Sequence, residues 1–232
     1  MRLQRMQRQT ALPLATPRNT ATQTAIAMNN AATANRAQLR RQLRAARRAL
    51  SHAQQQRAAR NLYKQLAQHP IFRRARHIAL YLPNDGEIDP GWLLRAAQRR
   101  GKVTYLPVLS AWPKTKMVFQ RINPQDKLRR NRFRIAEPLA NRARQRKAWA
   151  LDLILLPLVG FDAHGGRLGM GGGFYDRSLA HKTRHPGMHQ PRLLGLAHEC
   201  QRVEKLPTAS WDVPLQATVT ERGWYGVARR PN

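Results

Sequence analysis

The chain has 232 residues, which suits one α/β domain, or one domain with an extension. It carries 42 basic and 12 acidic residues, a formal net charge of +30, which favours anionic ligands without choosing among nucleic acid, anionic lipid and phosphorylated small molecules. A single cysteine, Cys200, excludes an intrachain disulfide, and no apolar run approaches the length of a membrane span, so we expect a cytoplasmic protein with no membrane partner.

The N-terminal segment differs in composition from the rest of the chain. Residues 1–33 are rich in Ala, Thr, Gln and Asn and show no apolar period, which predicts a disordered extension. The domain is then expected to cover residues 34–225, with a flexible tail over residues 226–232. The lone Cys200 is expected to be a small buried apolar residue.

A helix is predicted to start at Asn35. Its apolar face carries Leu39, Leu43, Ala46 and Leu50. An arginine stripe runs beside that face, formed by Arg36, Arg40, Arg44 and Arg47. Such a stripe is usually a solvated face, and a role in phosphate binding requires this helix to lie across the glycine loop described below. Ser51 is the expected N-cap of a second helix that ends near Pro70.

Strands and helices then alternate along the chain. Strands are predicted over residues 78–82, 103–106, 117–120, 153–156, 193–197 and 217–220, and helices over residues 92–100 and 174–182. The alternation predicts a single Rossmann-like α/β domain with three layers, α/β/α, in which a mostly parallel sheet has helices on both faces. Ligands of such folds bind at the carboxyl ends of the strands.

A glycine loop over residues 169–173 follows one of these strands. Without side chains, its backbone N–H groups can converge on an anion. Arg167 and Arg177 bracket the loop and suit phosphate oxygens, and Asp176 offers a hard oxygen ligand for Mg²⁺. The string matches neither Gly-x-x-x-x-Gly-Lys-Ser/Thr nor Gly-x-Gly-x-x-Gly. It therefore favours a nucleotide or phosphate site of another type, with a plain tight turn as the alternative.

Three carboxylates outside the loop can bind a ligand or serve a structural role. Glu87 follows the first strand and can accept hydrogen bonds from an amino-heterocycle, although it can also serve the dipole of the next helix. Asp212 joins Asp176 as a metal ligand if the fold brings them together, and is otherwise a loop cap. Residues 135–138 are expected to form a turn in which Glu137 acts as a cap or pairs with Arg134.

The order of these motifs resembles a known family. Asp152-Leu-Ile-Leu-Leu-Pro-Leu-Val-Gly-Phe-Asp162 and Arg167-Leu-Gly-Met-Gly-Gly-Gly-Phe-Tyr-Asp-Arg177 are similar to the signature of the 5-formyltetrahydrofolate cyclo-ligases, also called methenyltetrahydrofolate synthetases. Further segments fit in order within residues 35–222: 36–40, 82–89, 101–107, 135–138, 204–207, 211–212 and 219–221. Many spaced matches in order are more specific than any one of them.

The resemblance implies an enzyme of folate one-carbon metabolism, with ATP and Mg²⁺ bound beside 5-formyltetrahydrofolate. The formyl oxygen would attack the γ-phosphate, and N10 would then close the ring to 5,10-methenyltetrahydrofolate, with release of ADP and phosphate. Such a reaction needs a clamped triphosphate more than acid–base machinery, which agrees with the absence of a nucleophilic triad in the sequence. A monomer is expected.

The resemblance also assigns residues to roles. ATP would contact Arg36, Arg40, Arg167, Leu168, Gly169, Met170, Gly171, Gly172, Gly173, Phe174 and Tyr175. The catalytic residues would be Arg167 and Tyr175. The folate would contact Leu82, Glu87, Met170 and Phe174. The metal ligands would be Asp176 and Asp212.

Four positions depart from the family pattern. Arg36 stands where a lysine is frequent, and Phe174 stands where a tyrosine is frequent. Trp211 precedes the aspartate where histidine is common, and Gln216 replaces a second aspartate, so metal binding would rely on Asp212.

The charge motivates an alternative function. A basic RNA-binding protein on the same fold, with ligase activity lost or secondary, is the second hypothesis; the chain has no recognised nucleic-acid module, so this partner is not favoured. A sugar-phosphate enzyme of similar architecture is a third, against which the segment around Glu87 and the helix of Arg36 and Arg40 both argue.

Overall fold

The computed structural model describes residues 35–110, 115–185, 190–207 and 212–226. The chain divides into two units, Met1–Asn35 and Arg36–Asn232, and the second unit holds the fold. The extension expected over residues 1–33, Trp211, and the expected tail beyond Gly226 all lie outside the described residues.

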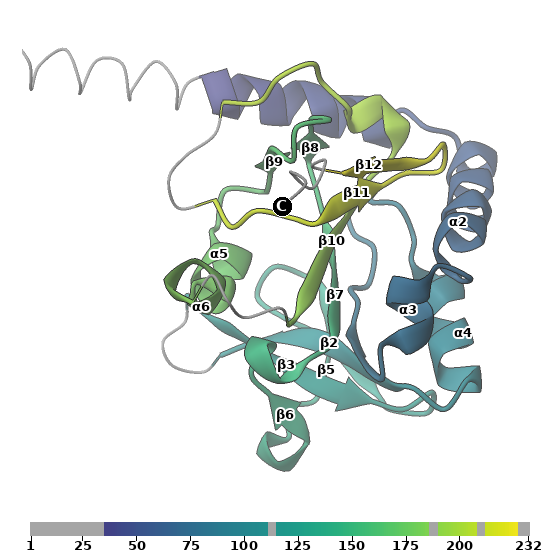
Figure 1. The fold of residues 1–232 in the computed structure, drawn as a ribbon, viewed down its shortest axis with the longest axis vertical. Helices are drawn as coiled ribbons and strands as arrows, with labels where there is room; N and C mark the ends of the chain where they lie inside the picture. The colour runs from purple at the N-terminus through teal and green to yellow at the C-terminus, as the bar shows by residue number, and fades with distance from the viewer. Residues whose placement is uncertain (1–34, 111–114, 186–189, 208–211, 227–232) are drawn as a thin grey trace, which may run out of the picture. The chain divides into compact units, whose positions relative to one another are not determined.

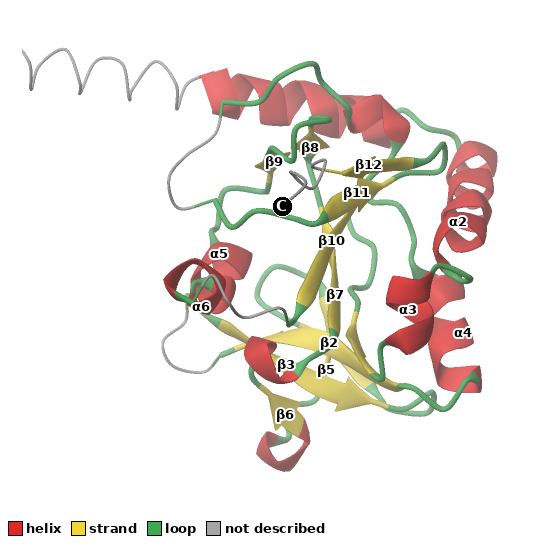
Figure 2. Cartoon of the chain, viewed as in Figure 1, coloured by secondary structure: helices red, strands yellow, loops and turns green. Residues whose placement is uncertain are grey.

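An eight-stranded sheet forms the centre of the second unit (Figures 1 and 2), in the order β12-β11-β10-β7-β1-β2-β3-β6. Its strands are β1 (His77–Ala79), β2 (Val103–Leu109), β3 (Met117–Ile122), β6 (Gln145–Arg146), β7 (Leu153–Pro157), β10 (Arg192–Leu196), β11 (Ala217–Val219) and β12 (Trp224–Gly226). The central run from β2 through β1, β7 and β10 to β11 is parallel, whereas β12, β3 and β6 join antiparallel at the edges. The mostly parallel sheet expected from the sequence is confirmed.

Helices lie on both sides of this sheet (Figure 1). Residues 35–48 are helical. The other helices are α2 (His52–Leu66), α3 (Pro70–Arg74), α4 (Gly91–Arg99), α5 (Phe174–Leu179) and α6 (His181–Arg184), with the 3-10 turns η1 (Arg142–Arg144), η2 (Ala148–Ala150) and η3 (Glu199–Gln201). The predicted N-cap is present: Ser51 accepts a hydrogen bond from Gln54 N and forms a capping box with that residue. The helix expected over residues 174–182 is divided into α5 and α6 at Ala180.

Two apolar clusters fix the layers. Successive residues of a strand point to opposite faces, so Leu155 of β7 packs in one cluster and Leu156 in the other. The first cluster joins the sheet to α2, α3 and α4, and the second contains Leu179 of α5. A third cluster packs Leu43 of the first helix against Leu168. Burial of these faces is the main stabilising contribution to the fold.

Two short ribbons stand apart from the main sheet. β4 (Leu128–Arg130) pairs with β5 (Ala136–Pro138), and β8 (Gly160–Phe161) pairs with β9 (Arg167–Leu168). The turn expected over residues 135–138 is therefore wrong, because residues 136–138 form β5 and the reversal lies before them. Arg134 there has a φ of 60°, and the side chain of Asn131 donates a hydrogen bond to Glu137. Glu137 serves this ribbon and is not paired with Arg134.

Cys200 differs from its expected environment. Cys200 lies in η3 and is exposed, so its expected burial is wrong.

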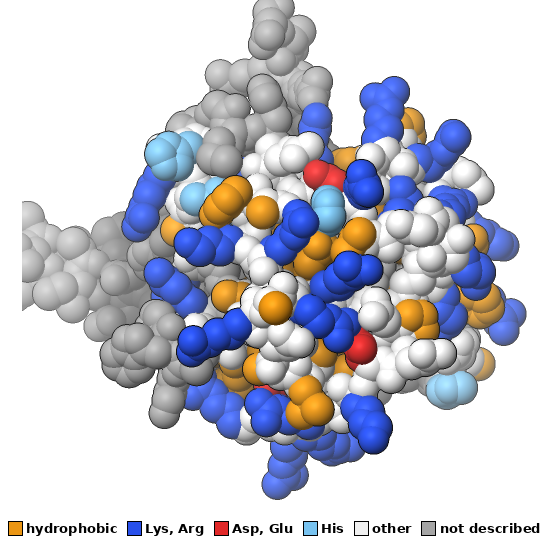
Figure 3. All heavy atoms as spheres, turned by 90° about the horizontal axis from the view of Figure 1, so that it is seen from below, with side chains coloured by type: hydrophobic (Ala, Val, Ile, Leu, Met, Phe, Trp, Pro, Cys, Tyr) orange, Lys and Arg blue, Asp and Glu red, His pale blue; other side chains and the backbone are white. Residues whose placement is uncertain are grey.

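On the face drawn in Figure 3, Lys and Arg side chains are dispersed among hydrophobic and neutral groups, with few acidic ones. Across the described ranges, none of the helices combines the length and apolar character needed to cross a membrane.

Candidate active site

The first helix lies across the glycine loop, as phosphate binding by the arginine stripe requires. Arg40 Nε donates a hydrogen bond of 2.9 Å to the carbonyl of Gly169. A Cβ atom on Gly171 would lie 3.5 Å from the guanidinium carbon of Arg40. Burial and the charge of Arg36 lower the pKa of Arg40. Two guanidinium groups of this helix therefore lie close enough to repel each other, and an anion bound beside them would relieve that repulsion.

The backbone of the loop needs its glycines. Gly171 has a φ of 94° and Gly173, which precedes α5, has a φ of 62°. Residues with a Cβ atom rarely adopt these values. Met170, between the first two glycines, is 52% exposed, and Phe174 at the start of α5 is half-buried. The loop therefore presents mainly backbone toward solvent, next to Arg40.

Two arginine–aspartate pairs flank the loop. Arg167 Nη2 bonds Asp176 Oδ1, and Arg167 Nε donates a 2.7 Å hydrogen bond to the carbonyl of Val213. The N–H of Val213 is 3.5 Å from the same oxygen of Asp176. Arg36 donates from both terminal nitrogens to the carboxylate of Asp212, at 3.0 and 3.3 Å. Val213 directly follows Asp212 in the chain, and its N–H lies next to the Asp176 carboxylate. The two carboxylates predicted to bind metal are therefore near each other.

These two carboxylates fit the chemistry of Mg²⁺, which binds proteins through one or two carboxylates plus phosphate oxygens and water. The described residues contain no group of three or more His, Cys, Asp or Glu placed to hold a metal ion without such a substrate. Gln216, which stands in place of a further aspartate, accepts a hydrogen bond from the N–H of Leu193 in β10. That amide is therefore engaged by the backbone, and Asp176 and Asp212 are the two candidate ligands.

A buried aspartate holds the hairpin that presents Arg167. Asp162 is 3% exposed and accepts hydrogen bonds from the N–H groups of His164, Gly166 and Leu206 at 2.8–2.9 Å. These bonds close the connection between β8 and β9, and Arg167 is the first residue of β9. The position of Arg167 therefore depends on this carboxylate cage.

We expect Gly166→Ala to destabilise the protein by about 1–3 kcal/mol, the usual cost of forcing atoms into a packed site. The new methyl group would overlap a carboxylate oxygen of Asp162 and lie 2.8 Å from its Cγ, and three N–H groups hold that carboxylate in place. Urea unfolding measures the change. Gly223→Ala is the matched control, since a Cβ there meets no atom within 4 Å. Equal stabilities of the two variants would show that the Asp162 carboxylate is not held in place by these hydrogen bonds.

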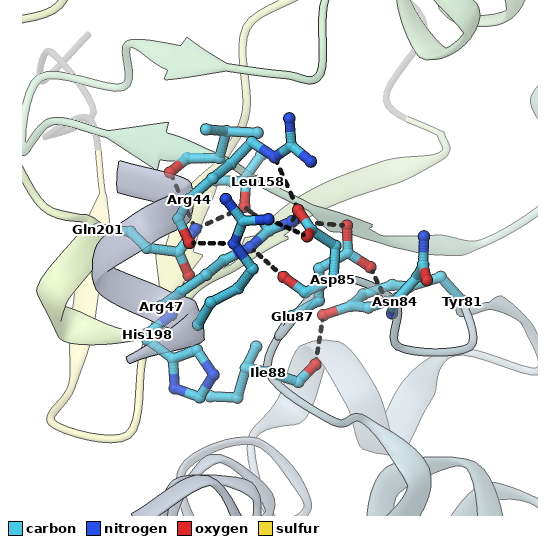
Figure 4. Close-up of polar contacts among 12 residues, drawn as sticks. Arg44, Arg47, Tyr81, Asn84, Asp85, Glu87, Ile88, Leu158, His198 and Gln201 are labelled. Carbon is cyan, nitrogen blue, oxygen red and sulfur yellow. Dashed lines mark hydrogen bonds and ion pairs between the residues drawn. The ribbon is translucent and has the colours of Figure 1, made fainter. Parts of the chain in front are cut away.

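The turn over residues 84–87 holds the second part of the site (Figure 4). Asp85 and Gly86 have φ values of 53° and 75°, and Asn84 N donates a 3.1 Å hydrogen bond to Glu87 Oε2. Burial raises the pKa of Glu87 to about 7, although the charge of Arg47 and the hydrogen bond from Asn84 act against burial. The carboxylate is therefore poised between its two protonation states near neutral pH.

Two tyrosines connect this turn with the glycine loop. Burial, followed by the charge of Glu87, raises the pKa of both Tyr81 and Tyr175. The hydroxyl of Tyr81 donates a 2.7 Å hydrogen bond to the carbonyl of Ile88. Tyr175 lies in the first turn of α5, so Glu87 acts electrostatically on a residue of the loop region. Leu82, also predicted to contact substrate, is half-buried just before the turn.

Sequence reasoning missed three contributors. Phe133 of the β4–β5 ribbon meets Phe174 edge to face, with ring centroids 5.8 Å apart. Tyr81 is buried, and its hydroxyl bonds the carbonyl of Ile88, next to Glu87. Arg47 belongs to the arginine stripe, yet it is fully buried, and Asp85 is its partner. The one available signal was Asp85 itself, which is the first acidic residue of a very basic chain.

Comparisons with known proteins agree with this arrangement. The model of the 5-formyltetrahydrofolate cyclo-ligase family matches residues 32–221. The 5-formyltetrahydrofolate cyclo-ligase of Escherichia coli (strain K12) is 41% identical over 178 residues, which cover 77% of this chain and 96% of that protein. The cyclo-ligase of Haemophilus influenzae is 39% identical over 183 residues, 79% of this chain and 96% of its own. An NMR structure of Aquifex aeolicus 5,10-methenyltetrahydrofolate synthetase is 28% identical, with a TM-score of 0.72 over 85% of this chain and 95% of that one.

Proposed function

The chain belongs to the 5-formyltetrahydrofolate cyclo-ligase family, and on this premise we propose that its glycine-loop site converts 5-formyltetrahydrofolate and ATP to 5,10-methenyltetrahydrofolate, ADP and phosphate. The observation that carries the proposal is the meeting of the arginine helix, the glycine loop and the Glu87 turn. They bring phosphate-binding and heterocycle-binding groups to one region.

The triphosphate binds over the glycine loop. Arg40 already lies against the loop, and Arg36 lies within the same helix beside Asp212. The backbone and side chains from Arg167 to Tyr175 complete the contact. An arginine that is paired with a carboxylate in the free protein can exchange that partner for a phosphate oxygen at little cost in unpaired charge.

The reaction needs positioning and charge stabilisation. The formyl oxygen of the substrate attacks the γ-phosphorus of ATP and displaces ADP, and N10 then attacks the activated formyl carbon. Phosphate leaves with the former formyl oxygen, and N10 loses its proton. Arg167, which is buried and aimed at Asp176, stabilises the charge on the transferred phosphoryl group, and the Tyr175 hydroxyl orients the reacting groups as a neutral donor.

Asp176 and Asp212 are the residues that would hold Mg²⁺. When bound, the ion neutralises charge on the phosphates and orders their oxygens. Both carboxylates offer oxygen atoms as metal ligands, and they lie near each other. Arg167 and Arg36, which pair with these carboxylates, can bind the phosphate oxygens of ATP directly.

The folate binds on the side of the Glu87 turn. The Glu87 carboxylate accepts hydrogen bonds from the amino-pterin, while Leu82, Met170 and Phe174 contact its apolar surfaces. The edge-to-face contact of Phe133 with Phe174 supports that ring from behind. A monomeric state and a cytoplasmic location belong to this proposal as expectations from the sequence.

A spectrophotometric assay tests the function. Purified protein receives 5-formyltetrahydrofolate, Mg²⁺ and ATP, and methenyltetrahydrofolate is followed by its near-ultraviolet absorbance. Product must depend on ATP, and ADP must form in equal amount. Failure to form ATP-dependent product would overturn the proposal. The RNA-binding hypothesis gains nothing from the face drawn in Figure 3, where the basic groups form no continuous band.

The Glu87 carboxylate predicts a pH dependence. Its pKa is raised to about 7 by burial, so it is ionised above that pH and protonated below it. A protonated acid is a poor acceptor for an amino-pterin. We therefore expect kcat/KM for 5-formyltetrahydrofolate to fall about tenfold for each pH unit below about 7, measured with ATP saturating, because kcat/KM reports groups of the free enzyme. Glu87→Gln should have a lower kcat/KM and lack this acidic limb. Survival of the limb in Glu87→Gln would assign it to another group.

A further inference from the structure

Arg47 is a fully buried cation that contacts the turn carrying Glu87 and the segment just beyond β7. Nε donates a 2.8 Å hydrogen bond to the carbonyl of Asp85, and Nη2 donates a 2.9 Å bond to the Asp85 carboxylate. Nη1 donates a 3.1 Å bond to the carbonyl of Leu158, beyond the end of β7. The same Nη2 lies 3.8 Å from Glu87 Oε1. One guanidinium therefore joins the first helix, the central sheet and both carboxylates of the turn (Figure 4).

The surroundings leave Arg47 as the nearest cation to Glu87. Arg44 bonds Asp85 at 2.7 Å, and its smaller charge effect on Glu87 comes last among those that shift the pKa of that carboxyl. Burial lowers the pKa of His198 to about 4, so this ring beside Gly86 is neutral at physiological pH. The remaining groups that face Glu87 are Asp85, which raises its pKa, and the hydroxyls of Tyr81 and Tyr175.

The geometry needs an arginine rather than any cation. A guanidinium presents five N–H donors in a fixed plane and retains its charge when buried. Arg47 uses this plane to bind two backbone carbonyls and a carboxylate at once. The ammonium of a lysine is a point charge on a flexible stem and cannot reproduce that set of directions.

We propose that Arg47 is the positioning residue for the substrate-binding carboxylate of Glu87, an inference that rests on the proposed function of the site. Arg47 holds the turn over residues 84–87 at a set distance from the end of β7 and favours the ionised form of Glu87. It acts on the folate half of the reaction and leaves the ATP half to Arg36, Arg40 and Arg167.

The test separates charge from geometry with two variants. Arg47→Met removes the charge, so the acidic limb of kcat/KM for 5-formyltetrahydrofolate should move to higher pH by about one unit. Arg47→Lys keeps a charge but loses the donor plane. Its limb should stay near pH 7 while KM for 5-formyltetrahydrofolate rises about tenfold. KM for ATP should stay within twofold of the wild-type value in both variants.

Arg48→Met is the matched control. Arg48 also pairs with the Asp85 carboxylate, at 3.4 Å, but its side chain is 53% exposed, so solvent screens its charge. Both the acidic limb and KM for the folate should be unchanged in this variant.

Several outcomes would overturn the inference. One is a folded Arg47→Met protein whose acidic limb has not moved. Another is an Arg47→Lys protein whose KM for the folate is within twofold of wild type, and this variant decides the matter if Arg47→Met fails to fold. Equal rises in KM for ATP and folate would show a general structural role. Calorimetric titration of wild-type protein with 5-formyltetrahydrofolate separates failure of this inference from failure of the proposed function. If wild-type protein neither binds the folate nor forms product, the proposed function itself is rejected.

Discussion

Replacement of Arg167 by alanine is expected to lower kcat about a thousandfold, the scale seen when a cation that stabilises a transferred phosphoryl group is removed. Arg167 is 7% exposed and bonds both Asp176 and the carbonyl of Val213. The side chain is therefore held before substrate arrives. Steady-state kinetics should show the loss mainly in kcat, because the interaction strengthens as charge develops on the phosphoryl oxygens.

The control for this variant is an arginine–aspartate pair to which no role in the candidate site is assigned. Arg144 bonds the Asp126 carboxylate through both terminal nitrogens, and both side chains are half-buried. Arg144→Ala should keep wild-type kinetics. Since Arg167→Ala leaves Asp176 without its partner, circular dichroism must first establish folding, and Arg167→Lys provides a milder variant. A folded Arg167→Ala protein with kcat within tenfold of wild type would place catalysis elsewhere.

Asp176→Asn is expected to lower kcat/KM for ATP about a hundredfold, and the Mg²⁺ concentration that gives half the maximal rate should rise. The amide preserves the shape of the side chain and an oxygen for the bond from Arg167, but it removes the negative charge that attracts a hard cation. Rates measured over a series of Mg²⁺ concentrations separate weaker metal binding from loss of folding.

Asp126→Asn is the matched control, since it makes the same change in an arginine pair away from the glycine loop. Its Mg²⁺ dependence should equal that of wild type. An Asp176→Asn enzyme with unchanged Mg²⁺ dependence would remove this carboxylate from the metal site, even if its kcat were reduced.

The alternation of elements was predictable because it depends on local chemistry. Ser51 and Gln54 specify the start of α2 within a few residues, and Gly101, with a φ of 68°, follows the end of α4. The short ribbons were not predictable. β5 contains Pro138 and is only three residues long, so its sequence resembles a turn, and pairing with β4 is what makes it a strand.

The candidate site was predictable as a set of residue types but not as a set of partners. The sequence offered the glycine loop, Glu87 and an arginine stripe, whose usual location is a solvated face. In the structure every member of the stripe has a partner in the site. Arg36 pairs with Asp212, 176 residues away, Arg40 with Gly169, and Arg44 and Arg47 with Asp85.

The sequence by itself therefore determined the α/β class, the presence of the glycine loop and the family resemblance, since each depends on short segments whose conformation and chemistry are local. The tertiary structure decided which cations meet which carboxylates. Such pairing depends on the distance between segments far apart in the chain, and on burial, which raises the pKa of Glu87 to about 7 despite the opposing charge of Arg47. No local pattern encodes either quantity.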